Sequence, residues 1–297
     1  MMQLKVHAAK WWEKEEDSKT RCLLCPRRCL IPDGGAGVCA VRLNRGGELV
    51  SQAYGYPVAL QIDPIEKKPL RHFLPRTGTF SIGTLGCNLK CVFCQNHHLS
   101  RAAYQERLTY RYFEPRQIAE LTKRHGCASL SFTYNEPTVF GEYVIDAANA
   151  AHEIGLKTVL VSNAYINREA AKEIYPLMDA ANIDIKGFSE EYYREMCGGS
   201  LKPVTDAVEF YKNEIGGHVE LTYLVIPGKN DADQMIDDYL DWVETKLGID
   251  TPLHFTAYHP DYKYSASPRT PLELLYKIQN HALVDRKFPN VYLGNIC

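Results

Sequence analysis

From Thr79 to the end of the chain, short apolar runs alternate with amphipathic segments. The apolar runs are rich in β-branched residues and predict buried strands, whereas the amphipathic segments predict helices. The predicted strands span residues 79–86, 129–136, 157–163, 180–187, 218–228, 252–260 and 290–295. The predicted helices span residues 115–126, 138–155, 167–179, 190–197, 203–215, 231–248 and 270–285. This alternation predicts a parallel α/β sheet, either doubly wound and open or curved into a full or partial barrel.

Residues 1–78 lack this periodicity and are rich in Cys, Gly, Pro and Arg. We therefore expect two regions, a Cys-rich N-terminal metal-binding region at 1–78 and a (β/α) barrel core at 79–297. Four cysteines of the first region, Cys22, Cys25, Cys29 and Cys39, follow one another closely. They predict a second metal site, which either holds structural Zn²⁺ or a further Fe–S cluster.

The bulk composition excludes several classes of protein. The chain has 297 residues, of which 45% are hydrophobic, and its formal net charge is −2, so a nucleic-acid partner is not favoured. It contains no apolar stretch long enough for a membrane span and no apolar signal segment at its start. We therefore expect a cytoplasmic protein, in which ten cysteines are better candidates for metal binding than for disulfides.

Three more cysteines, Cys87, Cys91 and Cys94, directly follow the first strand of the periodic region, with the spacing C-x3-C-x2-C. A structural zinc site needs four protein ligands, which in this loop would require a distant residue such as His97 or His98. Three thiolates on a [4Fe–4S] cluster leave one iron open to an exogenous chelator. Cys127 and Cys197 are expected to be buried thiols without a role.

With Phe93 before its third cysteine, this loop resembles the signature of the radical S-adenosylmethionine (SAM) superfamily. "TYNEPT" (133–138) resembles the Gly-Gly-Glu-Pro motif of that family, with Tyr134 and Asn135 at the glycine positions. "DIK" (184–186), "VIPGKND" (225–231) and "YHP" (258–260) resemble segments of pyruvate formate-lyase activating enzymes. "LCPRRC" (24–29) and "DPIEKKPLRHFLP" (63–75) extend the resemblance to the AmmeMemoRadiSam-system radical SAM proteins.

The resemblance implies a partial (β/α)6 barrel and an enzyme with a [4Fe–4S] cluster and SAM as cofactors. The reduced cluster would cleave SAM to methionine and a 5′-deoxyadenosyl radical, which abstracts hydrogen from an unidentified substrate or partner protein. Activation of a glycyl radical enzyme is one option, and a small molecule or lipid is another. A low-potential electron donor such as flavodoxin or ferredoxin is implied. The alternative is a zinc-binding α/β interaction protein without redox chemistry.

The resemblance also implies roles for single residues. Cys87, Cys91 and Cys94 would ligate the cluster. SAM would be held by residues at the ends of several strands, namely Phe93, Asn135, Glu136, Ser162, Asn163, Asp184 and Ile226, of which Phe93 and Ile226 would flank the adenine. Lys186 and His259 would line the substrate side and act as catalytic residues.

Overall fold

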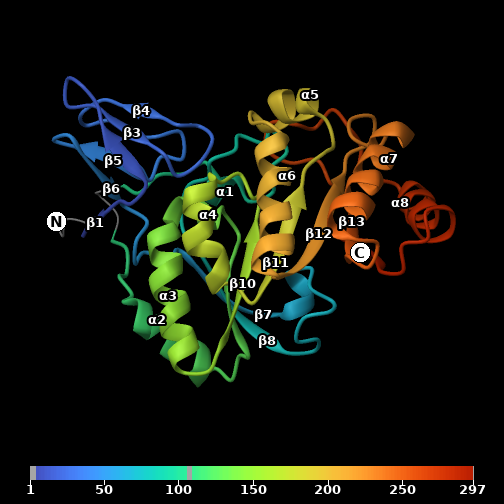
Figure 1. Ribbon diagram of the computed structural model, residues 1–297, viewed down its shortest axis with the longest axis horizontal. Helices are drawn as coiled ribbons and strands as arrows, with labels where there is room; N and C mark the ends of the chain where they lie inside the picture. Colours follow the sequence, from blue (N-terminus) through green and yellow to red (C-terminus); the bar gives the residue numbers. More distant parts are fainter. Residues whose placement is uncertain (1–4, 106–108, 297) are drawn as a thin grey trace.

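One large sheet organises the protein (Figure 1). In the computed structural model, which describes residues 5–105 and 109–296, eight strands form this sheet in the order β14-β13-β12-β11-β10-β9-β8-β7. Their bounds are Ala59–Pro64 (β7), Gly78–Gly83 (β8), Ser129–Phe132 (β9), Lys157–Ser162 (β10), Ala180–Ile185 (β11), His218–Val225 (β12), Leu253–Ala257 (β13) and Val291–Gly294 (β14). β8 to β14 are parallel, which confirms the predicted α/β class, and β7 pairs antiparallel with β8 at one edge.

Helical segments follow each strand from β8 to β13, giving six βα units before the final strand β14. The helices are His97–Ser100 (α1), Pro115–Arg124 (α2), Gly141–Glu153 (α3), Arg168–Ile174 (α4), Glu190–Tyr192 (α5), Lys202–Glu209 (α6), Asp233–Trp242 (α7) and Leu272–Asn280 (α8). α2 starts where the sequence predicts, because Glu114 and Gln117 form a capping box and Pro115 occupies the first turn. The partial (β/α)6 barrel is thereby confirmed.

The N-terminal residues form two small sheets that the sequence does not predict. Their strands are two to four residues long, namely His7–Ala8 (β1), Trp12–Lys14 (β2), Thr20–Cys22 (β3), Leu30–Ile31 (β4), Arg42–Arg45 (β5) and Glu48–Ser51 (β6). They pair in the orders β1-β6-β5 and β2-β3-β4. Figure 1 shows these strands packed above α3 and α4, at one side of the large sheet.

A buried ion pair fastens the N-terminal strands to the large sheet's helices. Arg42 of β5 donates to Glu142 of α3 at 2.8 Å, and the two side chains are only 1% and 2% exposed. The backbone N–H of Lys10 also donates to Glu142. A buried arginine without this carboxylate would be an uncompensated charge, so the pair fixes where the N-terminal strands lie.

The segment between β7 and β8 crosses the amino end of the parallel strands. Its backbone N–H groups at Arg71 and His72 donate to Glu220, which also accepts hydrogen bonds from the imidazoles of His218 and His254. Burial alone would raise the pKa of Glu220, but these four partners lower it to about 2. The segment between β7 and β8 and its hydrogen bonds to Glu220 thus cover the amino end of the sheet.

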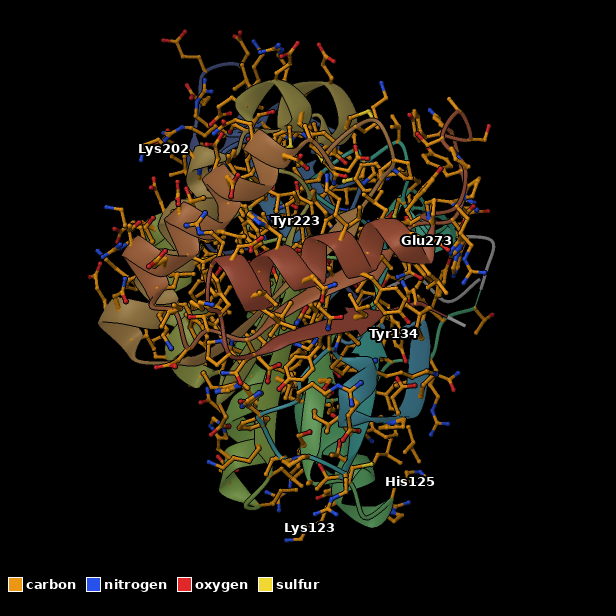
Figure 2. All side chains as sticks on the ribbon, turned by 90° about the vertical axis from the view of Figure 1, so that its right-hand side faces the viewer. Lys123, His125, Tyr134, Lys202, Tyr223 and Glu273 are labelled. Atoms are coloured by element: carbon orange, nitrogen blue, oxygen red, sulfur yellow. The ribbon has the colours of Figure 1, made fainter. Side chains whose placement is uncertain are left out.

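The opposite, carboxyl end of the strands carries the predicted site residues. In Figure 2, Lys123 and His125, which precede β9, lie at the bottom of the molecule, whereas Tyr134, just after β9, lies near its middle. Functional residues of parallel α/β sheets gather at the carboxyl edge.

Candidate active site

The loop after β8 brings Cys87, Cys91 and Cys94 to the carboxyl edge of the sheet. Gly86 opens the loop with a φ of +89°, and a Cβ at this position would lie 2.3 Å from the carbonyl oxygen of Cys39. Only glycine fits both the left-handed backbone and this close approach. The N-terminal cysteine segment therefore packs directly against the start of the cysteine loop.

Two polar side chains that the sequence analysis missed hold this loop in shape. Arg101 donates to the carbonyl oxygens of Cys87 and Leu89 at 3.2 and 2.5 Å. Asn88 is 1% exposed and donates to the carbonyl oxygen of Tyr165 at 2.6 Å. A buried asparagine needs such hydrogen-bond partners. Nothing in the sequence hints at this role beyond the position of Asn88 between the first two cysteines of the loop.

The three thiols face different partners. Cys94 Sγ lies 3.1 Å from Ser100 Oγ, and Asn163 Nδ2 donates to Cys87 Sγ at 3.6 Å. Burial raises the pKa of Cys87 and of Cys94. The pKa of Cys91 is lowered, chiefly by a hydrogen bond from Cys197, with burial acting against this and the positive charge of Lys186 supporting it.

This donor set suits a [4Fe–4S] cluster. Every cysteine in the described ranges is free, so the three thiols are available as soft ligands. The positive charges of Arg101 and Lys186 lie close enough to act on Cys91, and they would offset part of the negative charge of thiolate ligands. The contact between Cys197 and Cys91 was not predicted, because the sequence separation hides it.

Glu136 connects the ends of β9 and β10. Its Oε1 accepts from the backbone N–H and hydroxyl of Thr138 and from the hydroxyl of Ser162, at 2.7 to 2.9 Å. Its Oε2 accepts from the backbone N–H of Asn163 at 2.8 Å. Burial raises the pKa of this carboxyl above its ordinary value, although these donors act in the opposite direction. Three of the predicted SAM-binding residues, Glu136, Ser162 and Asn163, are therefore in direct contact.

Asn135 joins the same cluster from the other side. Its Oδ1 accepts from the backbone N–H of Thr84, and its Nδ2 donates to the carbonyl oxygens of Leu85 and Gly86. The preceding residue, Tyr134, has a φ of +70°, the backbone conformation that favours the glycine found at this motif position. The side chain of Asn135 thereby fixes the start of the cysteine loop.

Asp184 and Lys186 form an ion pair of 2.8 Å at the end of β11. Burial by itself would lower the pKa of Lys186, but Asp184 and the thiol of Cys91 raise it above its ordinary value. Lys186 thus lies within electrostatic reach of Cys91 in the cysteine loop.

The remaining predicted residues lie around this centre. Phe93 is buried, with its ring 6.3 Å from that of Tyr192. Ile226 is also buried, and Asn230, which accepts from its N–H, donates to the carbonyl oxygen of Lys186. His259 is exposed and its Nδ1 lies 3.0 Å from Gln95 Nε2 in the cysteine loop.

The four N-terminal cysteines lie in one small region. Cys22 ends β3 and Cys29 directly precedes β4, and the N–H of Cys22 donates to the carbonyl oxygen of Cys29 at 2.9 Å. Cys25 and Cys39 lie within electrostatic reach of these thiols. Within residues 5–105 and 109–296, no three His, Cys, Asp or Glu side chains are arranged to hold a single metal ion. The second metal site therefore stays a prediction.

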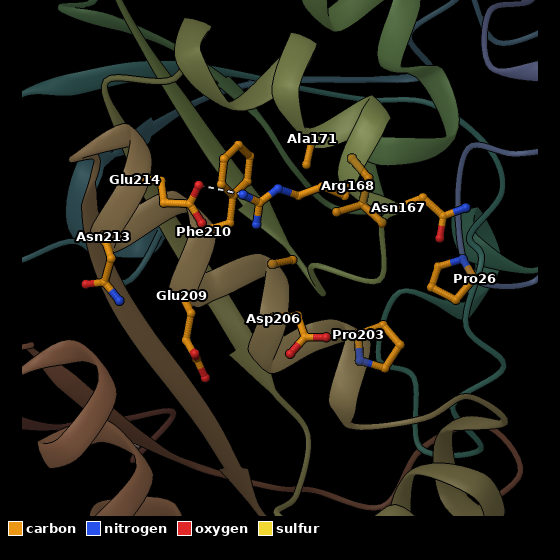
Figure 3. Close-up of a pocket in the computed structure, with 12 residues that line it drawn as sticks. Pro26, Asn167, Arg168, Ala171, Pro203, Asp206, Glu209, Phe210, Asn213 and Glu214 are labelled. Atoms are coloured by element: carbon orange, nitrogen blue, oxygen red, sulfur yellow. Dashed lines mark hydrogen bonds and ion pairs between the residues drawn. The ribbon is translucent and has the colours of Figure 1, made fainter.

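A groove of about 570 Å³ lies away from this centre, between α4 and α6 (Figure 3). Arg168 crosses it to pair with Glu214 and packs on the ring of Phe210. None of the predicted site residues lines this groove, so it does not enlarge the candidate site.

The arrangement agrees with the comparisons with known proteins. The family model described as "Radical SAM superfamily" matches residues 81–240. Over 294 residues the chain is 41% identical to "Uncharacterized protein MJ0808" of Methanocaldococcus jannaschii, covering 98% of this chain and 86% of that protein. Over 192 residues it is 22% identical to the 4-hydroxyphenylacetate decarboxylase activating enzyme of Clostridioides difficile, covering 59% of this chain and 61% of the relative, less than two thirds of its length.

A solved structure supports the fold independently. A radical SAM methyltransferase from Sphaerobacter thermophilus aligns with a TM-score of 0.57 at 15% identity, over 75% of this chain and 68% of that one. No helix in the described parts of the chain is both long and apolar enough to cross a membrane.

Proposed function

This chain belongs to the radical SAM superfamily, and from that premise we propose that Cys87, Cys91 and Cys94 hold its [4Fe–4S] cluster. The chain is accordingly an enzyme that uses SAM, and the alternative of a zinc-binding interaction protein without redox chemistry is wrong. When bound there, a reduced cluster would supply the electron for reductive cleavage of SAM, the chemistry that would generate a radical able to remove hydrogen from a substrate.

We propose that Glu136, Ser162, Asn163 and Asp184 hold SAM. The observation that carries this proposal is Asn163, whose backbone N–H donates to Glu136 while its side chain donates to Cys87. Among the described residues, Oε2 of Glu136 accepts only from Asn163, so it keeps capacity for an ammonium group. A carboxylate beside the first cysteine suits a ligand that carries an amino group and also binds iron.

Other residues act around these ligands. Asn135 uses its side chain on the cysteine loop, so we propose that it supports SAM binding by fixing that loop. Phe93 and Ile226 are buried beside the loop and β12, which suits apolar contacts with adenine. Lys186 and His259 are proposed to face the substrate, since His259 lies exposed against Gln95 of the loop.

We propose that the substrate is an organic molecule or a residue of a partner protein. Activation of a glycyl radical enzyme is favoured by relatives that are named activating enzymes, such as the one for 4-hydroxyphenylacetate decarboxylase. A low-potential donor such as flavodoxin or ferredoxin would supply the electron.

The test is SAM cleavage by anaerobically reconstituted protein, measured as 5′-deoxyadenosine after reduction with dithionite. Cys91→Ala should abolish the product, whereas Cys127→Ala, which removes a buried thiol beside Gly78 at the other end of β8, should retain it. Product formation by Cys91→Ala at the wild-type rate would refute the ligand assignment.

The N-terminal cysteines are proposed to hold a second metal, either Zn²⁺ or an Fe–S cluster. The proposal is supported by four thiols in one small region and by Arg42, whose charge acts on Cys22 and Cys39. A variant with Cys87, Cys91 and Cys94 replaced by alanine should still carry metal. Zinc alone would identify a folding clip, iron with sulfide would identify a cluster, and metal-free protein would refute a second site.

A further inference from the structure

The cysteine loop carries an exposed lysine beside two arginines of the N-terminal region. Lys90 directly precedes Cys91 and is exposed, as is Arg28 in the turn between β3 and β4. Arg27 is half-buried, and its Nε donates to the carbonyl oxygen of Asn88 in the loop at 2.8 Å. The N-terminal region therefore reaches the cysteine loop through a positively charged side chain.

Gly198 lies where these cationic side chains come together. A Cβ at Gly198 would lie 3.3 Å from Lys90 Cβ and 3.7 Å from Arg27 Nη2, so both side chains reach within 4 Å of one point. Arg28 follows Arg27 directly in the chain and adds a third positive charge. We call Arg27, Arg28 and Lys90 the cationic patch.

The charge of the cationic patch is not balanced by carboxylates. Within residues 5–105 and 109–296, none of its three members forms an ion pair, whereas the nearby Arg21 pairs with Glu15. The chain as a whole carries a net charge of −2, so the patch is a local excess of positive charge on a slightly acidic protein. Such an excess attracts an acidic partner and orients it during association.

We propose that the cationic patch is the docking surface for an acidic one-electron carrier protein, which reduces the cluster held by Cys87, Cys91 and Cys94. The proposal rests on the proposed function, because that function requires an electron at this loop. Docking beside Lys90 brings the carrier next to the residue that precedes Cys91. In the transfer, a flavin hydroquinone of the carrier loses one electron and becomes a semiquinone, and the oxidised cluster gains that electron.

A protein fits the cationic patch better than a nucleic acid does. Nucleic-acid binding draws its affinity from many contacts between cations and phosphates. Three cations on a chain with a net charge of −2 offer few such contacts. An acidic protein needs only enough complementary charge to be steered to the loop.

The test measures how fast reduced flavodoxin, as the acidic probe, reduces the cluster of anaerobically reconstituted protein in a stopped-flow experiment. At about 0.01 M salt, the double variant Arg28→Glu/Lys90→Glu should lower the second-order rate constant about tenfold or more. The difference from the wild type should vanish near 1 M salt, where the Debye length falls from about 30 Å to about 3 Å. After full reduction by dithionite, the variant should form as much 5′-deoxyadenosine as the wild type.

The matched control is Lys123→Glu/Arg124→Glu, which makes the same change of charge on exposed residues of α2. Figure 1 shows α2 well below β3 and β4, the strands that flank Arg27 and Arg28. The control should keep the flavodoxin rate constant within about twofold of the wild type, because it leaves the docking surface unchanged.

Equal flavodoxin rate constants in Arg28→Glu/Lys90→Glu and the control would overturn the proposal, as would a wild-type cluster that dithionite reduces and flavodoxin does not. Loss of affinity for a short RNA with an unchanged flavodoxin rate would assign the patch to nucleic acid and also overturn it. If Lys90→Glu lowers the iron content, Arg28→Glu alone gives the same comparison from outside the loop. A wild type that forms no 5′-deoxyadenosine with either reductant would instead refute the proposed function.

Discussion

Replacing Glu136 by glutamine tests how the ends of β9 and β10 are held together. The wild-type carboxylate is 2% exposed and accepts from four donors: two groups of Thr138, the hydroxyl of Ser162 and the N–H of Asn163. All four groups around the Glu136 carboxylate donate hydrogen bonds to it. In the glutamine variant, the amide NH₂ also donates, so it must face one of these donors. The N–H of Asn163 faces Oε2, so we expect this bond to be lost.

The structure sets the size of the effect. A hydrogen bond to a charged acceptor contributes roughly 1.5–3 kcal/mol, and a buried donor left unpaired costs a similar amount. The bonds that remain at Oε1 also weaken, since bonds to charged acceptors are about twice as strong as neutral ones. We therefore expect Glu136→Gln to lower the free energy of unfolding by about 3 kcal/mol. With a urea m-value of about 3 kcal/mol/M, the midpoint falls by about 1 M.

The assay is urea unfolding of metal-free protein, followed by tryptophan fluorescence. Glu120→Gln is the control, because Glu120 is an exposed partner of Arg116 on α2 and should cost less than about 0.5 kcal/mol. If Glu136→Gln unfolds at the same urea concentration as Glu120→Gln, the reasoning about a buried carboxylate that accepts from four donors is refuted. The SAM affinity of cluster-loaded Glu136→Gln then separately tests the proposed contact with SAM, which should weaken by about tenfold or more.

Two further predictions concern buried charges outside the site. Glu142→Gln leaves Arg42 buried without its carboxylate, so the free energy of unfolding should fall by about 3–5 kcal/mol; a loss below about 1 kcal/mol in urea unfolding would contradict this. The folded-state pKa of Glu220 lies at about 2, below its ordinary 4.5, so its contribution is present above pH 4.5 and is lost as the pH falls toward 2. That contribution to the free energy of unfolding is roughly 3 kcal/mol. Between pH 5 and pH 3, the urea midpoint should therefore fall less for Glu220→Gln than for the wild type. If both midpoints fall by the same amount, the lowered pKa of Glu220 does not stabilise the fold.

The periodic part of the fold could be predicted from the sequence. Each predicted strand from residue 79 onward overlaps a strand of the large sheet. Short apolar runs that alternate with amphipathic helices bury both their faces when they pair as parallel strands between those helices. The predicted strands differ from the observed ones mainly at their ends. The strand predicted for 129–136 stops at Phe132, since the chain turns at Tyr134 and Glu136 caps the short helical turn that follows.

The N-terminal region could not be predicted in the same way. Strands of two to four residues carry no readable period, and their place depends on partners far along the chain. The ion pair of Arg42 with Glu142, 100 residues apart, is of this kind. It leaves no local pattern in the sequence.

The sequence by itself determined the three-cysteine loop, its place after a strand and the sheet that carries it, because ligand spacing and hydrophobic period are local properties. Only the tertiary structure decided which distant groups surround that loop. Arg101, Asn163 and Cys197 reach it from separate elements, and they meet there because parallel strands place all their carboxyl ends at one edge. Cys197 lies far from Cys91 in the chain and beside it in space, and no spacing rule connects two such residues.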